Sequence, residues 1–342
     1  MIIQRLGSFC FLLLMLFFAD GLKAQHITLL QQGKPTSIRG LSVVDDKTAW
    51  ISGSKGYVAL TNNGGKTWAW KQVKGFEQAD FRGIEAFSAK EAVIMSSGTP
   101  ALILKTINGG TSWQVKYRNT DTAYFFDAMA FANPTHGMVL GDPINGKFVL
   151  LETINGGESW NIFKNDPNAL PGEAAFAASG TCLRFDNDAI SIVTGGKFCR
   201  ELVLYTQYYP TDWSINNVLI KHGKPTQGAF SISGTSRVIV GGDYKNDHST
   251  DSVAQYYSYN GTYAGGSISL SKTPPSGFQS CVEWISGNTY LSTGTPGSNI
   301  TTDNGETWVK IDSLSYNVCR KAKRGKLVLL AGSNGKIAVF KQ

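Results

Sequence analysis

Four copies of one eight-residue motif, spaced along the chain at regular intervals, constrain the fold of this sequence more than any other feature. Each copy has the form Thr-x-Asn/Asp-x-Gly-x-Ser/Thr-Trp, and the copies occupy residues 61–68, 106–113, 153–160 and 301–308. The first three tryptophans are 45 and 47 residues apart, and the fourth follows after 148 residues, close to three such intervals. An interval of this length is typical of proteins built from repeated structural units.

A second unit recurs between these motifs and consists of an apolar run, a polar turn and another apolar run. It occurs seven times, at residues 39–52, 82–95, 126–140, 181–193, 227–240, 279–292 and 317–330. Two repeats between Trp160 and Trp308 have lost the motif. Segment 205–213 keeps only the final Trp213, and segment 260–263 keeps an Asn-Gly turn followed by an aromatic residue. We therefore predict seven repeats of about 45 residues.

The chain has the pattern of many short strands rather than of helices. Its 38 glycines, together with Asn, Asp and Pro, interrupt runs rich in Val, Ile, Thr and Tyr. Each repeat is predicted to form a four-stranded antiparallel blade, and the chain an all-β, single-domain, seven-bladed β-propeller. The last repeat ends with its third strand at 336–341, so we predict that the N-terminal strand at 26–31 pairs into this blade and closes the ring.

The repeated motif is predicted to stabilise a turn, and we assign it no chemistry. Its Asn or Asp side chain can bond backbone groups within the turn, its glycine adopts positive φ without a steric penalty, and its Trp covers the hairpin. The structural residues predicted from the motif are Asn63, Trp68, Asn108, Trp113, Asn155, Trp160, Asp303 and Trp308.

With these motifs, the chain resembles the BNR/Asp-box propellers and, within them, the photosystem II stability/assembly factor-like family. The Asp-box has the form S/T-x-D-x-G-x-T/S-W, which residues 301–308 match fully, whereas the first three boxes carry Asn in place of Asp. The resemblance extends over residues 25–342 and implies a protein client, although photosystem II itself does not follow from it. Sialidases, other glycosidases and lectin-like receptors use the same box, so the box alone assigns no function.

The first 24 residues have the pattern of a cleavable signal peptide. Arg5 supplies a positive charge, residues 9–18 (FCFLLLMLFF) form a short apolar core, and Ala24 is a small residue suited to cleavage before Gln25. The core is too short to span a bilayer comfortably, which takes about 20 apolar residues. We predict that residues 1–24 are removed and that residues 25–342 are secreted or periplasmic, without a transmembrane segment.

The charge of the chain sets its partner class only broadly. A formal net charge of +7 is compatible with an acidic partner, and also with an ordinary lysine-rich surface. We predict a protein client or an acidic polymer as the partner, no nucleic acid, and a monomeric chain.

Candidate binding residues come from three loops that join the second and third strands of consecutive blades. In a propeller these loops, at 141–147, 195–201 and 241–252, share the face opposite the box turns. The candidates are Asp142, Lys197, Arg200, Glu201, Asp243, Tyr244 and His248. The alternative is that these are ordinary solvated loops.

Two arginines add to this face. Arg39 and Arg82 occupy matching positions at the start of the first two inner strands, near the mouth of the central channel. Two such guanidinium groups could bind a carboxylate or an acidic peptide. The alternative is that each arginine pairs with an acid of a neighbouring blade, for example Glu85 or Asp127.

Catalysis is not predicted, because the residues that a sialidase needs cannot be assembled. Such an enzyme uses three clamping arginines, a tyrosine nucleophile beside a glutamate, and an aspartate acid/base. Its early Phe-Arg-Ile-Pro motif is matched only in the first two residues of segment 81–84. We predict an exported, non-catalytic binding or assembly platform, with a glycan-acting hydrolase or lyase as the alternative.

No cofactor is predicted either. The four histidines show no close pair with metal-ligand spacing. Asp243, Asp247 and Asp251 could ligate calcium, although their segment lacks the full calcium-loop signature.

Four cysteines remain after signal cleavage, and their alignment suggests a pairing. Cys281 and Cys319 fall at the same height in neighbouring inner strands, and Cys199 lies in the loop of the blade that contains Cys182. We predict the disulfides Cys182–Cys199 and Cys281–Cys319, with free buried thiols as the alternative.

Overall fold

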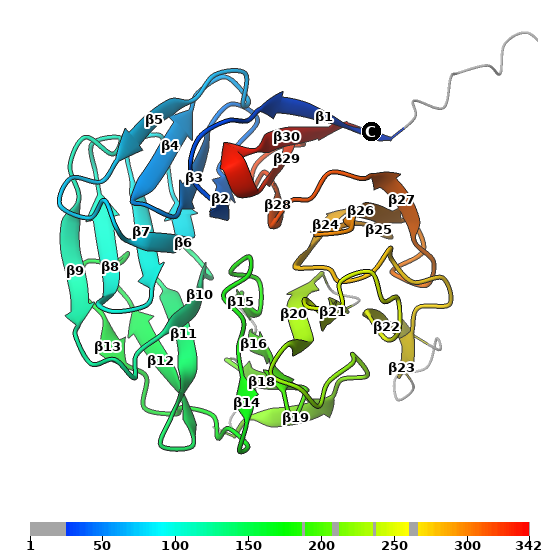
Figure 1. The fold of residues 1–342 in the computed structure, drawn as a ribbon. Coiled ribbons are helices and arrows are strands. Elements are labelled where there is room, and N and C mark those ends of the chain that lie inside the picture. Colours follow the sequence, from blue (N-terminus) through cyan, green and yellow to red (C-terminus); the bar gives the residue numbers. More distant parts are fainter. Residues whose placement is uncertain (1–24, 187–188, 207–211, 235–236, 260–265, 342) are drawn as a thin grey trace, which may run out of the picture.

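The chain folds into a ring of seven antiparallel sheets around a central space (Figure 1). This computed structural model describes residues 25–186, 189–206, 212–234, 237–259 and 266–341. The predicted signal peptide, segment 260–263 and part of segment 205–213 lie outside the described residues. Within them, no helix is long and apolar enough to cross a membrane.

Each blade has four strands that follow one another from the centre of the ring outwards. The strands of the first three blades are, in blade 1, β2 (Ile38–Val43), β3 (Ala49–Gly53), β4 (Tyr57–Thr61) and β5 (Ala69–Gln72); in blade 2, β6 (Asp80–Ala86), β7 (Ala92–Ser97), β8 (Ala101–Thr106) and β9 (Gln114–Asn119); and in blade 3, β10 (Phe126–Phe131), β11 (Gly137–Ile144), β12 (Lys147–Thr153) and β13 (Asn161–Ile162).

The next three blades repeat this order. Their strands are, in blade 4, β15 (Leu183–Phe185), β16 (Ala189–Val193), β18 (Arg200–Tyr205) and β19 (Ser214–Asn217); in blade 5, β20 (Gln227–Ser233), β21 (Val238–Asp243), β22 (Ala254–Tyr259) and β23 (Gly266–Leu270); and in blade 6, β24 (Cys281–Ser286), β25 (Thr289–Gly294), β26 (Gly297–Thr301) and β27 (Val309–Asp312). The seven-bladed architecture predicted from the repeats is confirmed.

Blade 7 joins the two ends of the described chain. It contains β28 (Val318–Lys321), β29 (Val328–Ala331) and β30 (Ile337–Lys341), with the 3-10 turn η1 (Ser333–Gly335) before β30, and its outer strand is β1 (His26–Gln31). β1 pairs antiparallel with β30, with Ile27 opposite Phe340. The predicted closure by the N-terminal strand is confirmed, since β1 completes the last blade as its fourth strand.

One sheet has more strands than the repeat predicts. Two short strands, β14 (Glu173–Ala174) and β17 (Gly195–Gly196), pair with each other and are joined to the sheet of blade 5 through the bridge between Gly195 and Gly228 of β20. The two glycines are required here, because a Cβ on Gly228 would lie 2.3 Å from the Cα of Gly195. This contact ties the segment that precedes blade 4 to blade 5.

The box turns are held by a repeated side-chain network. In the third box, Oδ1 of Asn155 accepts hydrogen bonds from Thr153 Oγ1 (2.9 Å) and from the backbone N–H of Ser159 (3.0 Å). The Gly157 N–H donates to Thr153 Oγ1 (2.9 Å). The other three boxes repeat these three bonds. All of them are local, which is why the motif can be recognised in the sequence.

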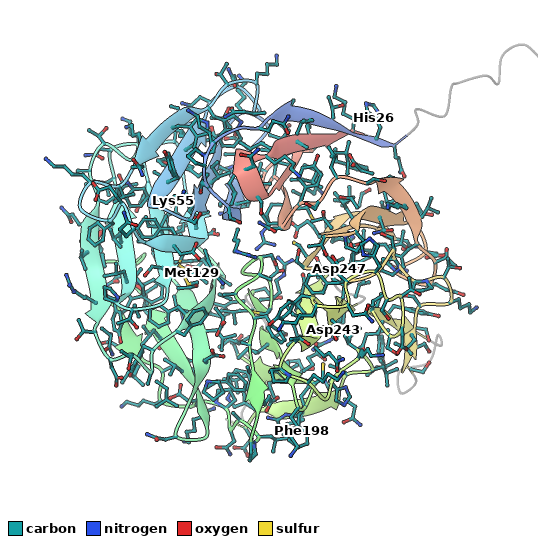
Figure 2. The ribbon with its side chains drawn as sticks, viewed as in Figure 1. His26, Lys55, Met129, Phe198, Asp243 and Asp247 are labelled. Carbon is teal, nitrogen blue, oxygen red and sulfur yellow. The ribbon has the colours of Figure 1, made fainter. Side chains whose placement is uncertain are left out.

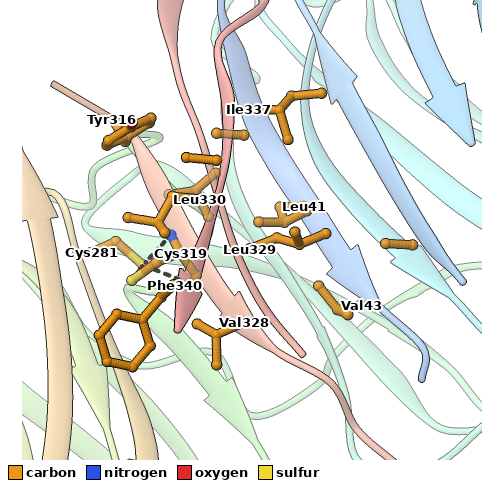
Figure 3. Close-up of a cluster of buried hydrophobic side chains, with 14 of the residues drawn as sticks. Leu41, Val43, Cys281, Tyr316, Cys319, Val328, Leu329, Leu330, Ile337 and Phe340 are labelled. Atoms are coloured by element: carbon orange, nitrogen blue, oxygen red, sulfur yellow. Dashed lines mark hydrogen bonds between the residues drawn. The ribbon is translucent and has the colours of Figure 1, made fainter. Parts of the chain in front are cut away.

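The inner strands carry the apolar core, which runs from blade to blade. Around the closing blade, Leu41, Leu329 and Phe340 pack with Cys281 and Cys319 (Figure 3). The two sulfur atoms are 3.7 Å apart, farther than the S–S bond of about 2.05 Å. All four described cysteines are buried free thiols in this structure. The neighbouring positions of Cys281 and Cys319 agree with the strand alignment, and both disulfide pairings stay predictions.

Candidate functional site

A cavity of about 400 Å³ opens at the starts of the inner strands, on the face opposite the box turns. Arg39 of β2, Arg82 of β6, Asp127 of β10 and Asp142 of β11 line one side of it. Three of these were predicted as ligand-binding residues, and the ring brings them together. The fourth, Asp127, was considered only as a partner for an arginine.

A loop before blade 4 forms the floor of this cavity. The backbone carbonyl groups of Ala177 and Ala178 accept hydrogen bonds from Arg82 (3.4 Å) and Arg39 (3.2 Å), and Ser179 accepts one from Arg320 of blade 7 (3.5 Å). Three blades on the far side of the ring thus hold one loop, which must reach into the channel. We call residues 175–180 the plug.

The plug lies between two cavities. Residues 175–178 line the cavity just described, whereas Gly180 lines a second cavity of about 490 Å³ at the opposite ends of the inner strands, on the side of the box turns. The repeat pattern does not predict the plug. The only signal in the sequence is the run of small residues from 174 to 180 (AAFAASG), which allows a chain segment to fit inside a narrow channel.

The two arginines differ in their partners. Arg82 pairs with Asp80 of its own strand, 2.7 Å from Nε to Oδ2, and not with Glu85 or Asp127 as the sequence alternative suggested. Within the described part of the chain, Arg39 forms no ion pair. Burial, followed by the charge of Arg82, lowers the pKa of Arg39. An anionic ligand would therefore form a charge-assisted hydrogen bond with this guanidinium group and stabilise its charge.

Two carboxyl groups face the same space. Asp127 is 1% exposed, and its Oδ2 has no hydrogen-bond partner among the described residues, nor has Oδ1 of Asp142. Burial raises the pKa of Asp127 well above its usual range, the charge of Asp142 adds to this, and Arg82 opposes it. Burial also raises the pKa of Asp142, although a hydrogen bond from the Ala175 N–H counteracts the shift.

An aromatic wall completes the cavity. Phe176 of the plug stacks on Phe230 of β20, with ring centres 3.9 Å apart, and Phe278 meets the edge of Phe230 at 4.7 Å. Tyr244 is 45% exposed and borders the same cluster. The site therefore combines charged groups of both signs with a flat apolar surface, an arrangement suited to binding an amphipathic ligand.

Comparison with known proteins agrees with the propeller fold. The sequence profile of the family described as "Photosynthesis system II assembly factor YCF48" matches residues 25–120. The solved structure of YCF48 bound to D1 peptide superposes with a TM-score of 0.63 at 14% identity, covering 92% of this chain and 97% of that chain. YCF48 from Cyanidioschyzon merolae gives a TM-score of 0.61 at 14% identity, covering 92% and 98%. The chain is a seven-bladed β-propeller that is similar to this family over residues 25–120.

Similarity in fold extends to proteins with other activities. Virginiamycin B lyase from Staphylococcus aureus matches this propeller with a TM-score of 0.62 at 13% identity, covering 93% of this chain and 99% of that chain. At such identities the comparison shows the fold alone. The search of curated proteins found no match in sequence.

Two further predicted binding residues of this propeller are engaged in ion pairs away from the cavity. Arg200 donates two hydrogen bonds to the buried Glu173, at 2.9 Å from Nε and 2.5 Å from Nη2. Glu201 is 3% exposed and pairs with Arg237. These contacts hold the plug segment and blade 5, so we leave both residues out of the site.

Of the remaining predicted residues, Lys197 and His248 lie on loops, whereas Asp243 is the buried last residue of β21. Lys197 sits over the ring of the adjacent Phe198, which Figure 2 places near the outer edge of the molecule. Asp243 accepts a hydrogen bond from Gln227 Nε2 (3.0 Å), and the exposed His248 pairs with Asp247 (2.7 Å). Neither Lys197 nor His248 lines the cavity.

The calcium hypothesis gains no support from this arrangement. Asp251 pairs with Lys221, while Asp243 and Asp247 bond the neighbours named above. Among the described residues, no three His, Cys, Asp or Glu side chains are close enough to hold a metal ion.

The buried Asp127 predicts a pH dependence of stability. A carboxyl group whose pKa is raised in the native state keeps its proton where the unfolded chain has lost it. Its contribution therefore favours folding at low pH and declines as the pH rises above about 4, by at most about 1.4 kcal/mol per pH unit. The variant Asp127→Asn has no carboxyl group to titrate at this position. Its free energy of unfolding relative to that of wild type should therefore increase with pH. Urea unfolding of both proteins at pH 4, 6 and 8 measures this difference, and a constant difference would contradict it.

Proposed function

We propose that this propeller is a non-catalytic platform that binds a segment of a client protein in the cavity beside Arg39 and Arg82. The observation that carries the proposal is the Arg39 guanidinium, which lines the cavity without an ion pair among the described residues, next to an aromatic wall. A peptide carboxylate can bond such a group while a neighbouring apolar side chain packs on the phenylalanines.

The comparisons support a protein partner. YCF48 has been solved with D1 peptide bound, and its family profile matches the first two blades of this chain. The proposed client segment carries a carboxylate, which binds the arginines, and an apolar side chain, which packs on the aromatic wall. We also propose that the chain is exported, on the basis of the pattern in residues 1–24.

A glycan-acting hydrolase or lyase is the second candidate. One observation favours it, because two carboxyl groups with raised pKa values meet in one cavity. Against it, the tyrosine that lines the cavity, Tyr244, packs against Phe230 and Phe278 rather than beside a glutamate. A binding platform therefore accounts for more features of the site than a glycan-acting enzyme does.

The test is a binding measurement with acidic, neutral and basic dodecapeptides that share the same apolar residues. Arg39→Ala combined with Arg82→Ala should weaken binding of the acidic peptide by about 1.5–3 kcal/mol for each charged hydrogen bond lost. The remaining affinity should depend less on salt, because fewer charges take part.

The matched control changes two basic residues on the opposite face. Lys323 pairs with Glu85 and lines the second cavity, together with Arg324. Lys323→Ala combined with Arg324→Ala should leave the affinity unchanged. A loss confined to this control variant would place the site on the side of the box turns and contradict the proposal.

A further inference from the structure

We propose that Asp127 and Asp142 form a separate subsite of the cavity that binds an organic cation, the ammonium or guanidinium group of a basic side chain. This inference does not depend on the carboxylate site at Arg39 and Arg82, because it rests on different groups. It follows from three features of the carboxyl pair: oxygen atoms without partners, the balance of nearby charges, and the aromatic wall beside the pair.

The first feature is unsatisfied hydrogen-bonding capacity. Oδ2 of Asp127 and Oδ1 of Asp142 are both inaccessible to solvent and without partners among the described residues, although both side chains line the cavity. Buried polar atoms are bonded in the great majority of cases, and an exception in a cavity indicates a group that a ligand completes. A cationic ligand supplies N–H donors for both oxygens.

The second feature is the count of charges. Among the described residues, the charged side chains that line the cavity are Arg39, Arg82, Asp127 and Asp142, and Arg82 is already paired with Asp80. With every group ionised the acids exceed the bases by one. A single added cation therefore neutralises the site, whereas an anion alone requires the carboxyl groups to remain protonated.

The third feature is the surface that would hold the rest of the ligand. Ala175, whose N–H bonds Asp142, is followed directly by Phe176, so the aromatic wall begins beside this carboxyl group. The faces of aromatic rings attract organic cations, and a desolvated contact strengthens this attraction. An inorganic cation would leave this apolar surface without a function.

Binding of a cation must be coupled to proton release. Burial keeps Asp127 and Asp142 protonated to a higher pH than usual. Asp127 interacts with Asp142 of β11, with Arg82 of β6 and with the thiol of Cys182 before β15. Arg39 of β2 lines the same cavity, and Asp80 is paired with Arg82. Since the cation binds the ionised carboxylate, raising the pH should raise the apparent affinity, by up to about tenfold per pH unit for each proton released.

The experiment is isothermal titration calorimetry of the chain with four small probes. Benzylammonium and benzylguanidinium carry the two cations, benzyl alcohol is their neutral counterpart, and benzoate reports on the arginines. We expect at least one cation to bind ten or more times as tightly as benzyl alcohol, and the tighter one identifies the preferred basic group. Titration in two buffers of different ionisation enthalpy should show that a proton is released.

Substitutions assign the probes to their sites. Asp142→Asn should weaken binding of the cation at least tenfold and leave benzoate binding intact, and Asp127→Asn provides a second test at the buried position. The matched control is Asp251→Asn, since Asp251 is ion-paired with Lys221 on an outer loop. It should bind all probes like wild type.

The outcomes separate this subsite from the proposed function. Benzyl alcohol binding as tightly as the cations, unchanged cation affinity in Asp142→Asn, or affinity that is constant between pH 5 and 8 would each overturn the subsite. Failure of benzoate to bind, with cation binding retained, would count only against the carboxylate site at Arg39 and Arg82.

Discussion

Replacing Trp160 with alanine should lower the free energy of unfolding by about 3–5 kcal/mol, as expected for truncating a buried aromatic side chain. Trp160 closes the third box turn and is 7% exposed. It packs with Val93 and Met95 of the preceding blade and meets the edge of Phe131 at 5.9 Å. Its removal therefore opens a cavity between two blades. Urea unfolding followed by tryptophan fluorescence and circular dichroism measures the loss.

The same turn provides the matched control. Ile154, at the second position of the box, is 71% exposed, so Ile154→Ala should change the stability by no more than about 0.5 kcal/mol. Binding of the acidic dodecapeptide by the folded fraction should be the same in both variants. A Trp160→Ala protein as stable as Ile154→Ala would show that the box tryptophan does not join the blades.

Replacing Arg200 with methionine should cost about 3–5 kcal/mol, because it leaves the buried carboxylate of Glu173 without its cation. Glu173 is 5% exposed and accepts bonds from Arg200 and from Thr194 Oγ1 (2.6 Å). It begins β14, the strand that leads into the plug. We therefore expect Arg200→Met to loosen the plug as well, which hydrogen exchange of residues 175–180 would detect.

A second substitution, at Glu173, distinguishes the effect of an unpaired buried carboxylate from a simple loss of packing. Glu173→Gln removes the buried charge, so the double variant Arg200→Met with Glu173→Gln should recover much of the lost stability. Equal losses in the single and double variants would mean that the ion pair contributes little. A loss of peptide affinity with unchanged stability would instead return Arg200 to the binding site, where the sequence placed it.

Some of the binding residues predicted from the sequence line the cavity and others do not, for a physical reason. Arg39, Arg82, Asp142 and Tyr244 come from strand starts and loop positions that any propeller gathers around its channel, and all four line the cavity. Arg200 has the same kind of position, but its partner Glu173 lies in a segment outside the repeat. Nothing in the spacing of the motifs indicates which long polar side chain will meet a buried acid.

What the sequence determined by itself is the repeated architecture: the box turns, the seven blades and the closure of the ring by the N-terminal strand. These depend on hydrogen bonds between residues close in the chain and on strand patterns that recur, so each copy reinforces the interpretation of the others. Only the tertiary structure decided how the channel is filled. The plug follows no repeat, and the meeting of Asp127 with Asp142, Arg82 and the wall of Phe176 and Phe230 depends on closure of the ring, which brings distant segments into one desolvated space.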